Sequence, residues 1–189
     1  MIEVSHVSAG YGGQDVLKDL SFSLPQGENL AILGPNGCGK TTLLRVMAGL
    51  LPCRGDVRVD GRSIARMKPR ELAAHIGLMS QNMQIPFDYT VEDVVRMGRY
   101  RMRRRGLFEA ENREDGQAVR DALETVGLWE LRNRTANTLS GGQQQRVFLA
   151  RVFAQQPEIV MLDEPTNHLD LSSQIELMQQ LRLYGSQPN

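Results

Sequence analysis

The first 33 residues alternate between apolar and polar positions. Ile2 and Val4 fall on one side of an extended segment, and Phe22 and Leu24 fall on one side of another. Side chains of a strand point alternately to its two faces, so a period of two predicts strands with one buried face. The Gly12–Gly13 pair lies between them and is a typical turn sequence. This segment therefore predicts antiparallel strands joined by turns.

A fully apolar run, Leu30–Leu33, comes next and ends at Gly34. Apolar residues on both faces predict a strand buried on both sides. From Thr41 to Met47 the apolar residues recur at helical spacing, and Gly49 predicts the end of that helix. The sequence thus predicts a strand, a glycine-rich turn and a helix in direct succession.

Four further elements follow from the same reasoning. Val57–Ile64 predicts a hairpin that turns at Asp60–Gly61, and Pro69 predicts the start of a helix. Ile76–Ser80 and Ile159–Leu162 are short apolar runs and predict buried strands.

Between Val91 and Ala154 the apolar period is that of helices. Ser140 occupies a favourable N-cap position for the last of them, and Pro157 ends it. Another helix is expected after Asp170. The pattern therefore predicts strands in the first part of the chain, a helical middle, and one strand followed by a helix at the end.

The turn after Leu33 carries the first candidate chemistry. It fits the phosphate-loop pattern G-x-x-x-x-G-K-[ST], in which backbone N–H groups surround phosphate oxygens and Lys40 reaches the β- and γ-phosphates. Thr41 supplies a hydroxyl ligand for Mg²⁺. The predicted nucleotide-contacting residues are Gly34, Pro35, Asn36, Gly37, Cys38, Gly39, Lys40, Thr41 and Thr42.

Two carboxylates follow the apolar run Ile159–Leu162. Asp163 is placed to bind the metal, and Glu164 is placed to activate the attacking water as general base. A structural acid after a buried strand is the alternative interpretation of Glu164. Lys40, Glu164 and Gln81 are the candidate catalytic residues.

A third motif, Leu139–Gln143, reads Leu-Ser-Gly-Gly-Gln and lies between the other two. With the three motifs in this order, residues 1 to about 183 resemble the nucleotide-binding subunit of ATP-binding cassette (ABC) transporters. The resemblance implies an α/β fold: a P-loop NTPase (RecA-like) core sheet, an antiparallel N-terminal β subdomain and an inserted α-helical subdomain. One domain, 1–189, is expected, with a core of 1–88 and 155–189 and a helical subdomain of 89–154.

The resemblance also implies roles for individual residues, with ATP and Mg²⁺ as cofactors. Tyr11 stacks on the adenine, although packing on the sheet is an alternative. Gln81 binds Mg²⁺ or water, although it could simply be a polar strand end. Ser140, Gly141, Gly142 and Gln143 close over the ATP of a second cassette in a head-to-tail dimer, expected to be a homodimer. Asn167–Asp170 forms a loop at that dimer interface, and His168 is a variant within it.

Composition limits the possible locations and partners. The chain has 189 residues, 41% of them apolar, a formal net charge of zero and two cysteines. A neutral chain has no overall attraction for nucleic acid, so none is expected as a partner. No apolar run approaches the ~20 residues of a membrane helix, and no secretory signal is evident. The expected place is peripheral, at the cytoplasmic face of the inner membrane.

The kind of transporter follows from a second resemblance. Tyr89–Tyr100, Gly106–Phe108 and Thr166–Leu171 are similar to ATPases of importers for iron–siderophore, haem or cobalamin, with zinc and manganese importers as the alternative. Transmembrane permease subunits, and indirectly a substrate-binding protein, are the partners implied. The basic run from Arg96 through Arg99 to Arg105 is interpreted as a solvated face or a surface near membrane headgroups or the permease.

The end of the chain departs from the family. Family members continue with another strand and a switch histidine, whereas this chain, with only His6, His75 and His168, is C-terminally short. Reduced stability and impaired hydrolysis are therefore expected, with nucleotide binding less affected. A cassette that binds ATP without efficient hydrolysis is one alternative function. A cassette ATPase acting on DNA or ribosomes is another, although such proteins usually carry insertions absent here.

Overall fold

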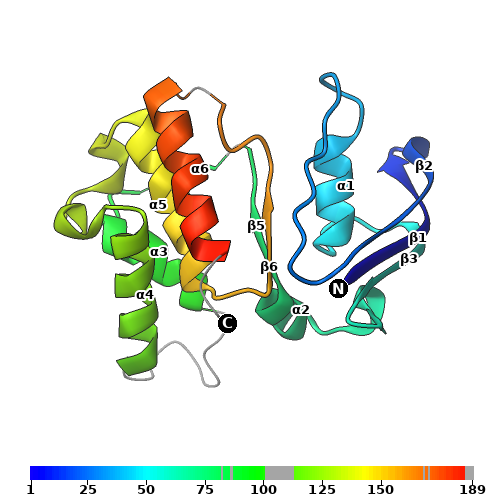
Figure 1. Cartoon of the computed structure of the whole chain (residues 1–189), viewed down its shortest axis with the longest axis horizontal. Helices are drawn as coiled ribbons and strands as arrows, with labels where there is room; N and C mark the ends of the chain where they lie inside the picture. The colour runs from blue at the N-terminus through cyan, green and yellow to red at the C-terminus, as the bar shows by residue number, and fades with distance from the viewer. Residues whose placement is uncertain (82, 86, 101–112, 168, 170, 186–189) are drawn as a thin grey trace.

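The computed structural model describes residues 1–189 except 82, 86, 101–112, 168, 170 and 186–189. A four-stranded antiparallel sheet forms the N-terminal part, at the right of Figure 1, in the order β2-β1-β3-β4. The strands are β1 (Ile2–Tyr11), β2 (Gln14–Leu24), β3 (Arg54–Val59) and β4 (Arg62–Ser63). The predicted strands and both of their turns are confirmed.

Alternation along β1 gives this sheet its buried face. Ile2, Val4 and Val7 are almost fully buried, while the neighbouring Ser5 is exposed. They pack against the buried side chains of α1 (Lys40–Met47), with Val46 at 1% exposure. The period of two in the sequence thus produces one hydrophobic layer between sheet and helix.

The predicted strand Leu30–Leu33 is wrong. The segment has no assigned strand, Leu30 is 48% exposed and Leu33 is 90% exposed. An apolar run becomes a strand only when neighbouring backbone pairs with its N–H and C=O groups. Among the described residues no strand pairs with this segment. The apolar surface therefore remains open to solvent.

Two parallel strands form the part of the core sheet seen in the structure. They are β5 (Ile76–Met79), which follows α2 (Pro69–His75), and β6 (Ile159–Leu162). Ile76 pairs with Ile159 and Met79 with Leu162, so both strands end at the same edge. The N–H of Asp163 donates to the Met79 carbonyl over 2.9 Å and extends this pairing by one residue. Residues that follow the two strands are thereby brought side by side.

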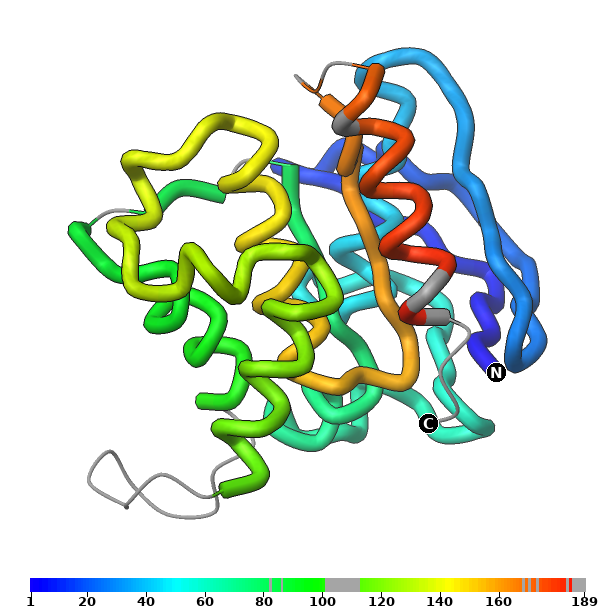
Figure 2. Tube along the Cα trace, turned by 60° about the vertical axis from the view of Figure 1, so that its left-hand side comes forward, coloured from blue at the N-terminus to red at the C-terminus, as the bar shows by residue number. Residues whose placement is uncertain are grey.

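Helices α3, α4, α5 and α6 lie on the side of β5 and β6 that faces away from α1 and the N-terminal sheet (Figures 1 and 2). Residues of α3, α4, α5 and α6 share one hydrophobic cluster with Met79 of β5, and Val95, Leu123 and Leu149 in it are fully buried. The predicted helical middle is confirmed for the described residues. The helices are α3 (Val91–Arg96), α4 (Arg113–Thr125), α5 (Gly141–Ala154) and α6 (Leu171–Gly185), with 3₁₀ turns at Ile64–Arg66, Met97–Arg99, Trp129–Leu131 and Ala136–Thr138.

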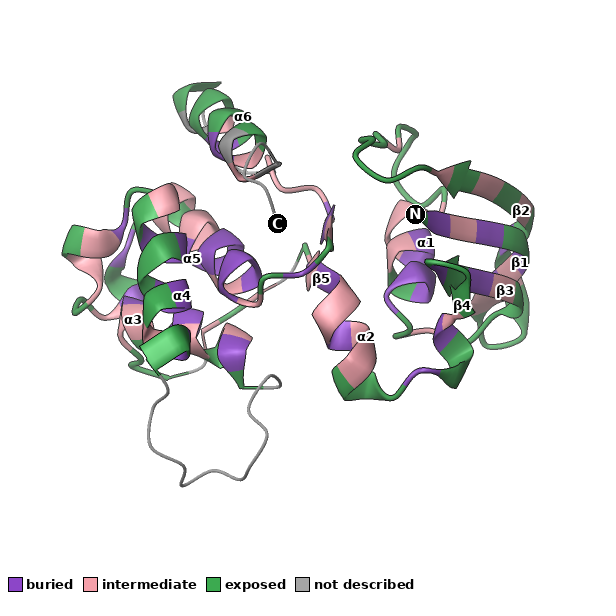
Figure 3. Ribbon diagram, turned by 60° about the horizontal axis from the view of Figure 1, so that its bottom comes forward, coloured by how far each residue is buried: buried purple, intermediate pink, exposed green. Residues whose placement is uncertain are grey.

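Burial is uneven over the molecule. Figure 3 shows buried residues concentrated where β1 and β3 face α1 and inside the α4–α5 pair, whereas much of β2 and α6 is exposed. No helix in the described part of the chain has both the length and the apolar character needed to cross a membrane.

The basic run is not a uniform solvated face. Arg99 is only 7% exposed; its guanidinium donates to Asp115 over 2.7 Å and to the carbonyl of Ala154 over 3.0 Å. Arg96 pairs with Glu92 one turn earlier on α3. The surface interpretation is therefore wrong for Arg99, which joins three helical segments. Arg101, Arg103, Arg104 and Arg105, and the Gly106–Phe108 segment, lie outside the described residues.

Candidate functional site

The phosphate loop lies between Leu33 and α1. Gly39 adopts φ +104°, and a Cβ there would lie 3.0 Å from the side chains of Val16 and Leu17. This position requires glycine both for its backbone angle and for the close packing on β2. The Lys40 ammonium donates to the carbonyls of Gly34 and Pro35 over 2.9 and 3.0 Å, folding back over the loop.

Thr41 and Asp163 meet although 122 residues separate them. The Thr41 hydroxyl donates to the Asp163 carboxylate over 3.0 Å, and Asp163 is 3% exposed. Thr41 lies in the first turn of α1, and Asp163 directly follows β6. A hydroxyl and a carboxylate in contact are ligands that suit Mg²⁺.

Glu164 lies at the centre of a set of polar contacts. One carboxylate oxygen, Oε2, accepts from the Gln81 amide over 2.5 Å and also from the Asn167 amide. The other oxygen, Oε1, lies 3.9 Å from the Lys40 ammonium. The sequence predicts that Gln81 binds metal or water, and in this structure its amide nitrogen donates to the predicted general base.

Lys40, Thr41, Gln81 and Glu164 line one cleft of about 570 Å³. Of the predicted nucleotide and metal ligands in these segments, Gly34, Pro35, Cys38 and Asp163 are not part of its lining. Tyr11 lies at its border, 46% exposed, and its hydroxyl accepts from Arg45 over 3.3 Å. The tyrosine is thus partly open to solvent beside the phosphate loop, where the sequence places a stacking ring. The lining residues are Tyr11, Val16, Asn36, Gly37, Gly39, Lys40, Thr41, Thr42, Gln81, Glu164 and Asn167.

The third motif, Leu139–Gln143, here called the signature, lies outside that cleft and begins the signature helix, α5. Ser140 caps α5, because its hydroxyl accepts from the N–H of Gln143 while the Gln143 side chain accepts from the N–H of Ser140. The predicted N-cap is confirmed. Gly141 is exposed, and space is open where its Cβ would be. Ser140, Gly141, Gly142 and Gln143 therefore do not line the cleft that holds this chain's own phosphate loop.

Comparison with known proteins decides the family. The family model described as ABC transporter matches residues 17–167, which is most of the chain. The chain belongs to the ABC transporter family. The expected fold is confirmed, with its antiparallel N-terminal sheet and helical subdomain. An ATP-binding cassette solved separately, MJ1267, shares this fold with a TM-score of 0.86 over 98% of this chain and 77% of that one, at 24% identity.

Several ABC relatives have names that refer to iron uptake. The ferric enterobactin transport ATP-binding protein of Escherichia coli (strain K12) is 43% identical over 176 residues, 93% of this chain and 64% of its own length. A hemin import ATP-binding protein of Bradyrhizobium diazoefficiens is 41% identical and covers 96% of this chain and 68% of its own. The chain thus spans about two thirds of the length of the curated relatives it matches.

A solved relative belongs to a whole transporter. An ABC transporter of the metal-chelate type in an inward-facing conformation matches with a TM-score of 0.82 and 33% identity. The match covers 98% of this chain and 68% of that chain. The likeness extends beyond the three motifs to nearly the whole of this chain.

Asn167 is a cleft residue of the cassette that motif reasoning did not identify as such. It was assigned to a dimer-interface loop together with His168 and Asp170, which lie outside the described residues. The sequence feature that could have identified it is its position three residues after Glu164, with Pro165 between them. The N–H of Asn167 donates to the Glu164 carbonyl over 3.1 Å, as in a β-turn, so the two side chains adjoin.

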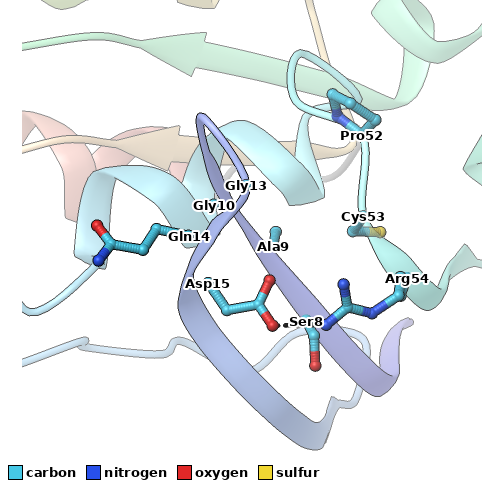
Figure 4. Close-up of a pocket in the computed structure, with 9 residues that line it drawn as sticks. All are labelled: Ser8, Ala9, Gly10, Gly13, Gln14, Asp15, Pro52, Cys53 and Arg54. Atoms are coloured by element: carbon cyan, nitrogen blue, oxygen red, sulfur yellow. Dashed lines mark hydrogen bonds and ion pairs between the residues drawn. The ribbon is translucent and has the colours of Figure 1, made fainter.

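A second hollow of the cassette, of about 330 Å³, lies beside the turn between β1 and β2 (Figure 4). An ion pair between Arg54 and Asp15, 2.5 Å long, crosses it. Cys53 is exposed overall, but partial burial of its thiol, with a smaller contribution from Asp56, raises the pKa of that thiol. Of the predicted nucleotide ligands none lines this hollow.

Three potential metal ligands gather at the opposite edge of the parallel strands. Asp60, His75 and Glu158 bring their ligand atoms within 4.8 Å of one another. His75 is already bonded to Glu158 over 2.6 Å, and Asp60 to the terminal ammonium of Met1 over 2.6 Å. These pairings account for the cluster. His75 and Glu158 directly precede β5 and β6, so the cluster lies at the ends of the strands opposite to the cleft.

Proposed function

We propose that this cassette binds and hydrolyses Mg-ATP to energise an ABC importer. The observation that carries the proposal is that Lys40, Thr41 and Glu164 line one cleft, with the buried Asp163 carboxylate bonded to the Thr41 hydroxyl. Phosphoryl transfer needs a cation at the γ-phosphate, a metal site and a water-activating group together. The cleft brings these three groups together, because Lys40 and Thr41 begin α1 while Asp163 and Glu164 directly follow β6.

Nucleotide binding uses the phosphate loop and the residues at its two ends. Lys40 exchanges the carbonyls of Gly34 and Pro35 for phosphate oxygens, which carry full charge and are the stronger acceptors. The loop N–H groups and the start of α1 add oriented dipoles. Tyr11 offers a partly exposed ring for the adenine. Stacking recognises no base edge, so weak base selectivity is expected.

The Thr41–Asp163 contact fits a magnesium ion. A hydroxyl and a buried carboxylate would hold the ion, and Gln81 remains a candidate third protein ligand. Bound Mg²⁺ would supply neutralisation of charge on the β- and γ-phosphates. Asp163 is fixed for this role by its backbone bond to Met79.

Hydrolysis is assigned to Glu164 as general base. Its Oε1 faces Lys40 at 3.9 Å, so this oxygen lies toward the position of the γ-phosphate. An attacking water between Oε1 and the phosphate would give its proton to this carboxylate. The second candidate, kept from the sequence, is a cassette that binds ATP without efficient hydrolysis.

A second cassette completes each site in this proposal. Ser140, Gly141 and Gly142 lie outside the cleft of their own chain. In a head-to-tail dimer the same residues would cover the ATP of the partner, and a homodimer would form two equivalent sites. ATP would then stabilise the dimer by mass action.

The proposed cargo is an iron chelate. The relatives named for ferric enterobactin and hemin support this class, with cobalamin kept from the sequence resemblance and zinc or manganese as the alternative. The cassette would attach to transmembrane permease subunits at the cytoplasmic face of the inner membrane, and through them act with a substrate-binding protein. Co-purification with transmembrane permease subunits tests this attachment.

Phosphate release from Mg-ATP by the purified chain is the direct test. We expect measurable turnover, its loss in Glu164→Gln with ATP still bound, and loss of binding in Lys40→Ala. Lys18→Ala, on the antiparallel sheet and outside the lining of the cleft, is the control and should change neither quantity. Binding without turnover in the wild type would support the second candidate. Equal turnover in Glu164→Gln would reject Glu164 as the base.

A further inference from the structure

A turn after β6 holds the proposed general base and a second polar residue together. Asn167 touches Glu164 twice: its backbone N–H donates to the Glu164 carbonyl, and its side-chain amide donates to Oε2. Pro165 follows Glu164 directly and suits the second position of such a turn. A short amide side chain at position 167 can therefore reach back to the carboxylate.

The backbone of Glu164 adds an independent observation. Its φ is +51°, in the left-handed region that residues with a Cβ adopt infrequently. Such angles persist where surrounding contacts fix them, and they concentrate at functional sites. The contacts here are the Asn167 turn and the bond between the Gln145 amide and the Pro165 carbonyl, 2.8 Å long. Two elements thus hold this short segment in place.

The two oxygens of Glu164 have different surroundings. Oε2 accepts from two amides, those of Gln81 and Asn167, while Oε1 faces the Lys40 ammonium at 3.9 Å. A carboxylate held through one oxygen cannot rotate freely about its last torsion. The other oxygen is then directed steadily toward the phosphate side of the cleft.

We propose that Asn167 is a positioning residue for hydrolysis: with Gln81 it holds Oε2 of Glu164, so that Oε1 is presented to the attacking water. The inference rests on the proposed function, because it assigns to Asn167 a role in the reaction of Glu164. Asn167 does not exchange a proton itself. It belongs to the turn that α5 contacts through Gln145, so the position of the base depends on the signature helix as well.

The contact can be tested on the free chain by NMR. Asn167→Asp keeps the size of the side chain but replaces the donating amide by a carboxylate facing another carboxylate. The side-chain NH₂ signals that disappear in this variant identify Asn167. We expect them to shift in Glu164→Gln and to stay in place in the matched control Gln117→Glu, which alters an amide-to-carboxylate bond on α4. Signals unmoved by Glu164→Gln would overturn the contact.

Steady-state kinetics with Mg-ATP test the role. We expect Asn167→Asp to lower kcat at least about tenfold, the scale of one hydrogen bond to a charged group, with KM changed less than about threefold. Asn167→Ala should fall between this variant and the wild type, and Gln117→Glu should match the wild type. An unchanged kcat, or a loss of kcat accompanied by a lower melting temperature, would overturn the positioning role.

The outcomes separate this inference from the proposed function. A wild-type chain without turnover would reject hydrolysis itself, and the role of Asn167 with it. An active wild type with an equally active Asn167→Asp variant would leave the proposed function standing and remove only the inference. Full activity of Asn167→Asp together with loss of activity in Glu164→Gln would support Glu164 as the general base and show that Asn167 does not position it.

Discussion

The helical part of the cassette and the segment that leads into the phosphate loop differ sharply in how their apolar residues are used. In α3–α5, Val95, Leu123 and Leu149 are fully buried in one cluster. In the segment before the phosphate loop, Leu30 and Leu33 are largely exposed and no strand forms. The segment before the loop therefore contributes little apolar burial, although α1 behind the loop is packed against the N-terminal sheet.

The difference follows from what each region requires. A helix satisfies its backbone hydrogen bonds internally, so α5 needs a partner only for its apolar side chains. An extended segment needs a neighbouring strand for its backbone as well. Ligand-binding segments are commonly the least stable parts of a protein, and their N–H groups must stay available for the ligand. The comparison predicts that substitutions of the same kind will have unequal effects in the two regions.

The largest contrast is expected between Leu149→Ala and Leu33→Ala. Leu149 is 0% exposed, so its truncation should lower the free energy of unfolding by about 2–5 kcal/mol through lost burial and a cavity. Leu33 is 90% exposed, and its truncation should change that free energy by less than about 0.5 kcal/mol. Urea unfolding followed by circular dichroism measures both. Similar losses in the two variants would contradict the contrast.

A buried ion pair sharpens the same comparison. Arg99→Ala should cost about 3 kcal/mol, because it takes from Asp115 a buried partner at 2.7 Å and leaves the Ala154 carbonyl without this donor. Arg62→Ala is the matched control, since it breaks an exposed pair with Glu71 and should matter little. Thermal melts of the two variants decide the point. An Arg99→Ala melt equal to that of Arg62→Ala would place Arg99 at the surface after all.

Sequence reasoning succeeded where local pattern was sufficient. Alternation predicted β1 and β2, the Asp60–Gly61 pair predicted the β3–β4 hairpin, and the cap at Ser140 predicted the start of α5. Each depends on residues close in sequence. Leu30–Leu33 failed because an apolar run shows only that a segment can be buried, while pairing depends on distant strands.

The candidate site divides in the same way. Lys40 and Thr41, and then Asp163 and Glu164, could be found from motifs, since the chemistry requires those residue types at fixed spacing. Asn167 could not, because an asparagine in a loop has many uses and only the turn shows which group it contacts. The bond of the Gln81 amide to the base also depends on the three-dimensional arrangement of β5 and β6.

Nucleotide bound at the phosphate loop should stabilise the folded chain. Mg-ATP at 100 times its Kd is expected to raise the free energy of unfolding by about 2.7 kcal/mol, because it binds the folded chain only. Lys40→Ala should lose most of this gain, while Leu149→Ala should keep it on a lower baseline. Melting with increasing Mg-ATP measures the gain in each variant. An equal gain in Lys40→Ala would show that the nucleotide binds without this lysine.

The smallest expected effect is a pH-dependent change in the free energy of unfolding. It arises from hydrogen bonds at the surface of the N-terminal sheet. The hydrogen bond from Ser63, followed by that from Arg58, lowers the pKa of the Asp56 carboxyl. A lowered folded-state pKa means that ionised Asp56 stabilises the fold above its unfolded-state pKa of about 3.9 and that this contribution is lost as pH falls through the folded-state value. Asp56→Asn should therefore be slightly less stable than the wild type at neutral pH, and the two should converge as pH falls through the folded-state pKa of Asp56. Urea midpoints measured from pH 7 downward test this, and a difference that grows on acidification would have the wrong sign for a depressed carboxyl pKa.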